Sequence, residues 1–325
     1  MINIAIVFGG FSSEHEVSVK SGKFIFDNLK NDPNWSIYEV CISKNYHTVK
    51  HKEEFYNLNY DDFTFEKNGE IIKPNLVVNM IHGDPGENGE LALILEDNNI
   101  PQTACNSGVS KLTFNKHKYI NFVKNLNIPC SDQLLLKKGQ TIDFDKVRNY
   151  FKLPFIVKPN SGGSSIGVSK IYSYDQLEKS IEIAFQEDDT VLIEKYLDGQ
   201  EVSVGVIQKK NERRILPITE IISNNDFFDF GAKYLGQSKE ITPGNISPKS
   251  KALIHDYINL IYDNLDLKGI TRSEFIIVND IPHILETNTI PGFTKQSIIP
   301  QQLEADGKFV KDVIFDLVNS NLNNF

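Results

Sequence analysis

The first hundred residues alternate between apolar runs and helical patterns, and this alternation constrains the fold more than any other feature. Apolar runs predict strands and helical spacing predicts helices, in the order 2–8, 18–29, 36–42, 76–81 and 89–98. Strands that alternate with helices form a parallel sheet whose faces the helices cover. Ligands collect where such strands end, and Gly9-Gly10 and His82-Gly83 lie at two of these ends. The sequence therefore predicts an N-terminal α/β domain with a ligand-binding edge.

The remainder of the chain divides into two further lobes. Residues 45–70 are polar, aromatic and poorly periodic, which indicates a surface excursion from the first lobe. A helical pattern from 113 to 127 contains Lys116 and ends at Ile128-Pro129, and a smaller α/β lobe follows it. Residues 224–245 are rich in Asn, Asp, Phe and Gly, which is typical of a mobile lid or a linker. We expect three domains, at residues 1–110, 111–210 and 211–325.

Composition limits the class of protein and its partners. The chain has 325 residues and a net charge of −9, and without a long basic run this charge argues against nucleic acid as a partner. Three cysteines without C-x-x-C spacing indicate a reduced compartment and no zinc site. The apolar run at 2–8 is too short for a signal peptide, and no run reaches membrane-spanning length. We therefore expect a cytoplasmic protein with no membrane partner.

Two carboxylates and one amide converge in the segment from 272 to 288. Residues 275–278 predict a strand, Asn279-Asp280 a turn, and Ile281 to Leu285 the returning strand of a hairpin. This hairpin brings Glu274 beside Glu286, and Asn288 shares a face with Glu286 because the two are two residues apart. Oxygen ligands on one face, with Arg272 close by, suit Mg²⁺ and phosphate oxygens. For these residues alone, a solvated hairpin edge is the alternative.

A small-residue loop supplies a second candidate site. The strand signal at 155–159 contains Lys158 and runs into the loop 160–168, which includes Ser164 and Ser165. Glycines let the backbone approach a polyphosphate closely, and the N–H and hydroxyl groups of the loop can donate to its oxygens. The loop is not a P-loop, because the lysine precedes the glycines. A flexible hairpin turn is the alternative for this loop taken alone.

Two strand signals after this loop, at 191–197 and 201–207, favour nucleotide binding. A strand edge whose backbone N–H and C=O groups face a cleft can recognise an adenine, and an acid such as Glu201 can accept hydrogen bonds from ribose hydroxyls. The residues expected at this edge are Glu194, Lys195, Tyr196 and Leu197.

In this order the segments resemble the ATP-grasp superfamily, and three motifs resemble the D-alanine–D-alanine ligase family in particular. The motifs are VFGGFSSEHEVS at 7–18, HGDPGENG at 82–89, and ETNTIPGFT at 286–294 with Ser297 beyond it. The resemblance spans nearly the whole chain. It implies an N-terminal parallel-sheet domain followed by a two-lobed ATP-grasp α+β fold, and a homodimer. It also implies that the product serves peptidoglycan synthesis.

The resemblance implies an acyl-phosphate mechanism. The carboxylate of one D-alanine attacks the γ-phosphoryl group of ATP, and the amine of a second D-alanine then displaces phosphate. Positioning and charge neutralisation carry such catalysis, with about two Mg²⁺ or Mn²⁺ ions on the phosphate oxygens. By resemblance, the metal ligands are Glu274, Glu286 and Asn288, and Arg272 stabilises the transition state. The residues matching the ATP site are Lys116, Lys158, Ser165, Glu194, Lys195, Tyr196, Leu197, Glu201 and Lys233.

The same resemblance assigns the amino-acid pocket. Glu14 matches the residue that holds the ammonium group of the first D-alanine, and Ser164 and Tyr234 match its hydrogen-bonding partners. Gly292 and Ser297 match residues that cradle the carboxylate of the second D-alanine. His82 lies by the first substrate in this picture, and a structural histidine is the alternative.

One departure from the family pattern and two alternative functions stay open. The family usually has Asp where this chain has Glu274, so the placement of the metal is the least secure part of the resemblance. A ligase that makes D-alanyl-D-lactate or another D-amino-acid pair is the alternative activity, although Tyr234 favours the dipeptide. A nucleotide-binding protein without activity is the alternative from another class, and retention of Lys158, Arg272, Glu286 and Asn288 argues against it.

Overall fold

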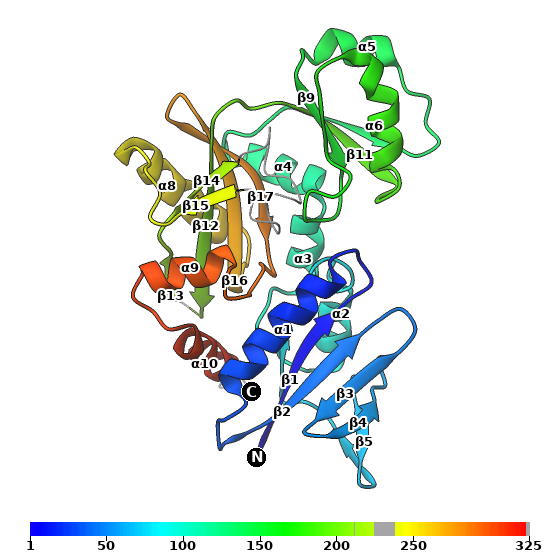
Figure 1. Cartoon of the computed structure of the whole chain (residues 1–325), viewed down its shortest axis with the longest axis vertical. Helices are drawn as coiled ribbons and strands as arrows, with labels where there is room; N and C mark the ends of the chain where they lie inside the picture. Colours follow the sequence, from blue (N-terminus) through cyan, green and yellow to red (C-terminus); the bar gives the residue numbers. More distant parts are fainter. Residues whose placement is uncertain (211, 224–237, 323–325) are drawn as a thin grey trace.

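Three large sheets follow one another along the part of the chain that the structure describes (Figure 1). This computed structural model describes residues 1–210, 212–223 and 238–322. The first sheet has five strands, the second four and the third six, and a two-stranded ribbon of β5 (Phe65–Lys67) and β6 (Glu70–Ile72) accompanies the first. The expected α/β fold, with an N-terminal sheet domain and two later lobes, is confirmed.

The N-terminal sheet has a parallel centre and an antiparallel edge. Its strand order is β4-β3-β2-β1-β7, with β1 parallel to both β2 and β7. The elements are β1 (Ile2–Gly9), α1 (His15–Leu29), β2 (Trp35–Ile42), β3 (His47–His51), β4 (Glu54–Asn57), β7 (Leu76–Asn79) and α2 (Glu90–Asp97). The predicted alternation is thus confirmed, and the sheet is mixed because β3 and β4 extend it in antiparallel fashion.

The prediction that residues 45–70 form a surface excursion is wrong. This segment holds two strands of the sheet and the first strand of the ribbon, and Val49, Leu58, Phe63 and Phe65 are buried in the core beneath the sheet. The buried residues are widely spaced among polar ones, so they produce no strong period in the sequence. Short antiparallel strands bury only a few side chains each, which explains the weak signal.

The prediction of one helix from 113 to 127 is also wrong, because two helices meet there. Helix α3 (Ser107–Phe114) ends at Asn115, and α4 (Lys116–Asn125) begins immediately after it. Asn115 is extended, with ψ of 95°, and its side chain accepts a hydrogen bond from the backbone N–H of Lys118. Asn competes well as an N-terminal cap and so restarts the helix. Lys116 therefore stands on the first turn of a helix.

The central sheet turns one face toward helices and the other toward a cavity. Its order is β10-β9-β11-β8, and every neighbouring pair is antiparallel. The elements are β8 (Gln133–Lys137), α5 (Phe144–Tyr150), β9 (Phe155–Pro159), β10 (Ser169–Ile171), α6 (Leu177–Ala184) and β11 (Thr190–Lys195). Phe155, Val157 and Ile193 pack against residues of α5 and α6. Because side chains alternate along a strand, Ile156, Lys158 and Glu194 face the opposite way.

The C-terminal sheet carries the predicted hairpin. Its order is β15-β14-β12-β16-β17, with β13 beside β12. The elements are β12 (Gln200–Lys209), β13 (Glu212–Ile215), β14 (Thr219–Ser223), β15 (Ser238–Ile241), α8 (Pro248–Asn264), β16 (Gly269–Val278), β17 (Ile281–Asn288) and α9 (Ile298–Ala305). Val202, Val204 and Val206 pack toward Ile254 and Ile258 of α8. The opposite face of β12 therefore faces α9 and the cavity.

The hairpin is confirmed in register. Asn279 and Asp280 both adopt positive φ, 51° and 63°, which suits a tight turn between twisted strands. Glu274 lies directly opposite Glu286. Pro282 is the second residue of β17, an edge strand, where a missing N–H donor is tolerated.

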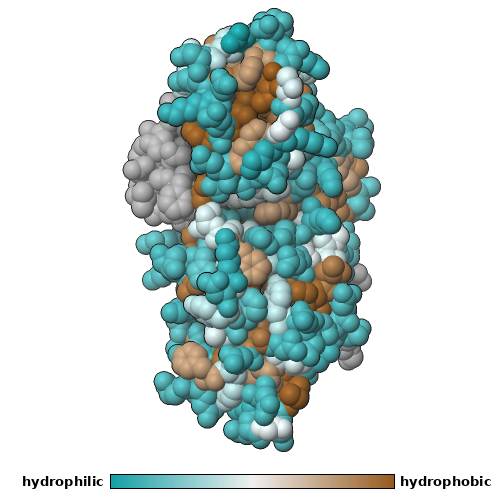
Figure 2. All heavy atoms as spheres, turned by 90° about the vertical axis from the view of Figure 1, so that its right-hand side faces the viewer, coloured by the Kyte–Doolittle hydropathy of each residue, from teal (hydrophilic) through white to brown (hydrophobic). Residues whose placement is uncertain are grey.

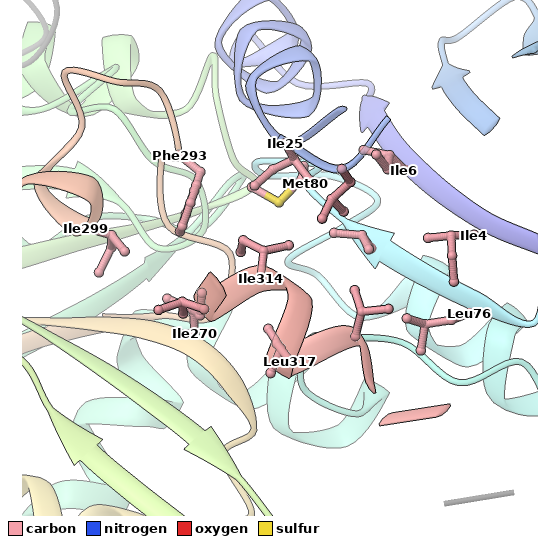
Figure 3. Packing of buried hydrophobic residues seen from close by; sticks show 14 of the residues in the cluster. Ile4, Ile6, Ile25, Leu76, Met80, Ile270, Phe293, Ile299, Ile314 and Leu317 are labelled. Atoms are coloured by element: carbon pink, nitrogen blue, oxygen red, sulfur yellow. The ribbon is translucent and has the colours of Figure 1, made fainter. Parts of the chain in front are cut away.

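The end of the chain returns to its beginning. Helix α10 (Val310–Leu322) places Ile314 and Leu317 in the cluster that contains Ile4 and Leu76 of the N-terminal sheet (Figure 3). Phe293 joins the same cluster. The loop after the hairpin is thus fixed against the first lobe by apolar packing. The domain boundaries given above stay a prediction.

The surface seen in Figure 2 is mostly hydrophilic, and apolar side chains gather chiefly on the upper lobe, which contains the central sheet. Across the described residues, none of the helices combines the length and the apolar character needed to span a bilayer.

Candidate active site

One cavity brings together most of the residues expected at the ATP site. It lies between the central and C-terminal sheets, and its walls are the glycine-rich loop, the end of β11 and the hairpin β16–β17. The expected residues that line it are Lys116, Lys158, Ser164, Ser165, Glu194, Lys195, Tyr196, Leu197, Glu201, Glu274 and Glu286. Apolar side chains from strands of both sheets and from the segments next to them complete it, at Ile156, Val168, Leu197, Ile276 and Leu285. A largely apolar slot with a few charged groups suits a nucleotide base beside its phosphates.

Two lysines of this set, Lys116 and Lys158, are paired with carboxylates. Lys158 on β9 forms an ion pair with Glu194 on β11, and both side chains are largely buried. Lys116 lies 3.2 Å from Glu286 and donates to the carbonyl of Gly162 at 2.5 Å. The glycine-rich loop and the hairpin are therefore linked through one ammonium group on the first turn of α4.

The glycine-rich loop is held to that helix by Asn160. Its backbone carbonyl accepts from the N–H of Lys116 at 3.0 Å, and its side-chain oxygen accepts from the N–H of His117 at 2.9 Å. Asn160 is buried. Helix N-termini leave such donors unsatisfied, so this contact fixes the start of the loop relative to Lys116.

The candidate metal ligands lie around Arg272. The guanidinium of Arg272 donates to Glu274 at 2.6 Å. In the amide orientation that satisfies its neighbours, Asn288 accepts from Arg272 at 3.2 Å and donates to Glu87 at 2.8 Å. Glu274 and Glu286 face each other across the two strands. An arginine and three oxygen-bearing side chains thus lie together on β16 and β17, and two of them, Glu274 and Glu286, line the cavity.

The donor set fits a hard divalent cation that also binds phosphate. Among the described residues, no group of three His, Cys, Asp or Glu side chains forms a self-contained metal site. Mg²⁺ is commonly held by one or two carboxylates together with substrate phosphates, which this set can provide. In the described part of the chain, the buried hydroxyl of Ser203 has no hydrogen-bond partner, and Ser203 lies opposite Glu274. An unsatisfied polar group beside a carboxylate is consistent with an outer partner for a bound ion.

The amino-acid end of the site is built around Glu14. The hydroxyl of Ser164 donates to the Glu14 carboxylate, and both residues are buried. A Cβ atom at Gly163 would lie 2.7 Å from Glu14 Oε2, so only glycine allows this approach. Ser164 has a positive φ of 53°, and its side chain reaches Glu14 of the first lobe. Segments 150 residues apart thus form one wall of the site.

His82 holds two lobes together. Its Nδ1 donates to the carbonyl of Ile290 at 2.8 Å, so its Nε2 accepts from the hydroxyl of Ser21 at 3.0 Å. The same hydroxyl accepts from the N–H of Phe293 at 3.2 Å. Burial lowers the pKa of His82, which favours this neutral ring. Both ring nitrogens therefore have protein partners, which favours the structural alternative for His82.

Gly292 and Ser297 lie together at the start of α9. The hydroxyl of Ser297 contacts both the backbone N–H and the hydroxyl of Thr294 at 2.9 Å. A Cβ atom at Gly292 would lie 3.3 Å from this hydroxyl. Lys233, Tyr234 and most of the expected lid at 224–245 lie outside the described residues, while the end of that range forms β15 and the loop after it.

Sequence reasoning missed Glu87, which lies within the motif at 82–89. Glu87 accepts from the N–H of Gly83 at 2.7 Å and contacts Asn288. Burial, and next the nearby carboxylate of Glu14, raise the pKa of Glu87 to about 8. The only sequence signal was an acid inside a glycine-rich turn at a strand end, beside the predicted ligand-binding edge.

Comparison with known proteins agrees with this architecture. The family models described as D-ala D-ala ligase N-terminus and C-terminus match residues 3–105 and 122–319. The D-alanine--D-alanine ligase of Flavobacterium psychrophilum is 47% identical over 301 residues, which cover 93% of this chain and 92% of the relative. That of Flavobacterium johnsoniae is 41% identical and covers 99% of this chain and 100% of the relative.

Solved structures agree with these relatives. The D-alanyl-alanine synthetase A of Vibrio cholerae has a TM-score of 0.88 at 27% identity and covers 100% of this chain and 99% of its own. VanG D-Ala:D-Ser ligase of Enterococcus faecalis has a TM-score of 0.85 at 26% identity, over 98% of this chain and 99% of its own. The resemblance seen in the motifs is thereby confirmed. This chain belongs to the D-alanine–D-alanine ligase family.

Proposed function

We propose that this protein joins two D-alanines into D-alanyl-D-alanine with conversion of ATP to ADP and phosphate, for peptidoglycan precursor synthesis. The observation that carries the proposal is the contact between Glu14 and Ser164. A buried carboxylate, which suits an ammonium group, contacts Ser164 in the wall of a cavity lined by lysines and apolar residues, and this contact supports the proposal. The full-length relative at 47% identity supports the same activity.

In the first step, a carboxylate oxygen of D-alanine attacks the γ-phosphorus and ADP leaves. Lys116 and Lys158 hold phosphate oxygens in this proposal, and both must exchange their present carboxylate partners for phosphate. Ser165 and the loop N–H groups cover the phosphates. The base lies between Ile156 and Ile276, with the backbone of Lys195 to Leu197 at its edge and Glu201 at the ribose.

Glu274, Glu286 and Asn288 would hold Mg²⁺ or Mn²⁺. A bound divalent ion neutralises charge that builds on the phosphate oxygens. Glu274 replaces the usual Asp, and its contact with Arg272 orients the longer side chain. Arg272 stabilises the transferring group through its planar fork of donors.

In the second step, the amine of the other D-alanine attacks the acyl carbon, and inorganic phosphate and a proton leave. Gly292 and Ser297 cradle the carboxylate of this D-alanine in the proposal, and Glu14 holds the ammonium group of the first. The position of Ser297 at the N-terminal end of α9 and its contact with Thr294 support this role. Tyr234 and Lys233 stay assigned by resemblance to the closing of the site.

A ligase for a different second substrate is the alternative. VanG, whose name specifies D-Ala:D-Ser, has nearly the same fold. Tyr234 is the residue expected to favour an amino acid over D-lactate. We also propose a homodimer and a cytoplasmic location, since ATP is a cytoplasmic substrate.

The test is phosphate release from ATP by the purified protein with D-alanine, D-serine, D-lactate or L-alanine. We expect release with D-alanine that depends on Mg²⁺, and background release with L-alanine. Products are identified by mass spectrometry, so that dipeptide and ester are separated. No release with D-alanine, together with release for another acid, would assign a different substrate.

A further inference from the structure

Lys170 makes a contact at the edge of the nucleotide cavity that the proposed mechanism does not use. Its ammonium group lies 3.9 Å from the centre of the Tyr196 ring and 5.1 Å from the centre of the Tyr172 ring. Lys170 belongs to β10, the strand that follows the glycine-rich loop, whereas Tyr196 follows β11. One cation thus connects two segments that are separate in sequence.

The face of the sheet on which Lys170 stands is the face that lines the cavity. Lys170 pairs with Ile156 across β10 and β9, and Ile156 pairs with Glu194 across β9 and β11. Directly paired residues share a face, and both Ile156 and Glu194 line the cavity. Val168, two residues before Lys170, lines it as well. Lys170 is therefore the outermost member of a row of side chains that borders the cavity.

Tyr196 stands on the short connection that leads from β11 of the central sheet to β12 of the C-terminal sheet. It is half-buried and lines the cavity, and Asp198 and Gly199 after it are exposed. At the far end of this connection, a Cβ atom at Gly199 would lie 2.9 Å from the carbonyl carbon of Ile277, so the backbone is pressed against β16. Lys170 supplies the matching restraint at the near end.

The amine of Lys170 is charged in this setting. Burial lowers its pKa, but the interactions with the side chains of Tyr172 and Tyr196 raise it more, so the pKa lies above its ordinary value. A cation over the face of an aromatic ring is attracted by the electron density of that face. The contact is close, and Lys170 is half-buried, so water screens it only in part.

We propose that Lys170 is a positioning residue for nucleotide binding, which fixes Tyr196 and couples the return strand of the glycine-rich loop to the connection between β11 and β12. The glycine-rich loop covers the phosphates and the connection borders the base. A contact between these two segments keeps the two walls of the cavity at a fixed separation before ATP binds. Preorganisation of this kind strengthens binding by reducing the ordering that the ligand must impose. The inference rests on the proposed function, since it takes the cavity to be the ATP site.

The test compares Lys170→Met, Lys170→Arg and the matched control Lys179→Met. Lys179 is an exposed lysine of α6 in the same lobe, with no aromatic contact described. Calorimetry with a non-hydrolysable ATP analogue gives Kd, and steady-state kinetics gives KM and kcat. We expect Lys170→Met to raise the analogue Kd and the KM for ATP by about threefold to tenfold, with little change in kcat. Lys170→Arg keeps the cation and restores most of the affinity.

A double-mutant cycle with Tyr196→Leu separates the contact from a general loss of stability. If Lys170 acts through Tyr196, Lys170→Met weakens nucleotide binding much less in the Tyr196→Leu background than in the wild type. Additive effects, or a Lys170→Met protein that binds like Lys179→Met, would overturn the inference. If wild type binds the analogue while D-alanine releases no phosphate, only the proposed function fails. If wild type binds no analogue, both fail.

Discussion

Lys116 on the first turn of α4 lies 3.2 Å from the carboxylate of Glu286 on β17, and both side chains are mostly shielded from solvent. The side chain assigned to phosphate binding thus contacts a side chain assigned to metal binding. Binding of phosphate together with a cation would replace one ion pair by two favourable contacts, Lys116 with phosphate and Glu286 with the metal. Either ligand alone would leave one partner of the pair uncompensated, which is costly in a shielded site.

Glu286→Gln should therefore reduce turnover by at least about tenfold and weaken metal binding, because it removes a charged ligand. The fold should persist, since Glu286 lies near the end of an edge strand. Turnover is followed by phosphate release, and metal affinity by paramagnetic resonance with Mn²⁺. Glu304→Gln, at an exposed position of α9, is the matched control. A Glu286→Gln enzyme with ordinary Mg²⁺ dependence would contradict the metal assignment.

Ser21→Ala should destabilise the protein by about 1–3 kcal/mol, because it leaves two buried groups without a partner. These groups are Nε2 of His82 and the backbone N–H of Phe293. The loop at 290–293 should then move more freely, and the KM for D-alanine should rise. Urea denaturation measures the first effect and initial rates the second. If neither the free energy of unfolding nor the KM for D-alanine changes, other contacts replace the hydrogen bond between Ser21 and His82.

Sequence patterns predicted the hairpin because its signals are local. Asn279-Asp280 supplies the turn, and the two-residue period puts Glu286 and Asn288 on one face. Sequence patterns did not indicate Glu87, because its role depends on contacts with other residues. It accepts a hydrogen bond from the nearby Gly83, and it contacts Asn288, which is about 200 residues further along the chain. The packing of α10 against the first sheet was equally invisible, since an amphipathic helix does not reveal which sheet it will cover.

The end of the helix at Asn115 shows another limit. Asn lowers the stability of a helix interior only modestly, so the helical spacing of apolar residues on both sides of Asn115 predicted one continuous helix. The capping bond to Lys118 and the contacts of Asn160 with α4 decide the break. Those contacts come from the glycine-rich loop, and a sequence alone does not show that the loop folds onto that helix.

Glu87 should make stability depend on pH. Its pKa is raised from 4.5 to about 8, chiefly by burial. Between these values the unfolded chain has released a proton that the folded protein keeps, so the free energy of unfolding falls as pH rises. Glu87→Gln removes this contribution and should flatten the fall. Urea denaturation of the ligand-free protein at about pH 5 and about pH 8 measures the difference between the two proteins. If the free energies of unfolding of the wild type and of Glu87→Gln change by the same amount between these two pH values, the raised pKa is contradicted.

Gly163→Ala should damage the amino-acid site more than the nucleotide site. The added methyl group would lie 2.7 Å from Oε2 and 2.8 Å from Oε1 of Glu14, which is closer than such atoms approach. Either the loop or the carboxylate must shift, and a displacement of this size typically costs about a hundredfold when it misplaces a substrate. We expect the KM for the first D-alanine to rise steeply, while the affinity for an ATP analogue falls little.

The control is Gly108→Ala in α3, where an added Cβ would meet only Asn106 Oδ1 at 3.5 Å. Initial rates over a range of D-alanine concentrations give both substrate constants, and calorimetry gives the affinity for the analogue. If the KM for D-alanine and the Kd for the ATP analogue rise by the same factor, the loop is displaced as a whole. A Gly163→Ala protein with normal D-alanine kinetics would show that the Glu14 carboxylate has room to move, and would remove Glu14 from its assigned role in holding the ammonium group.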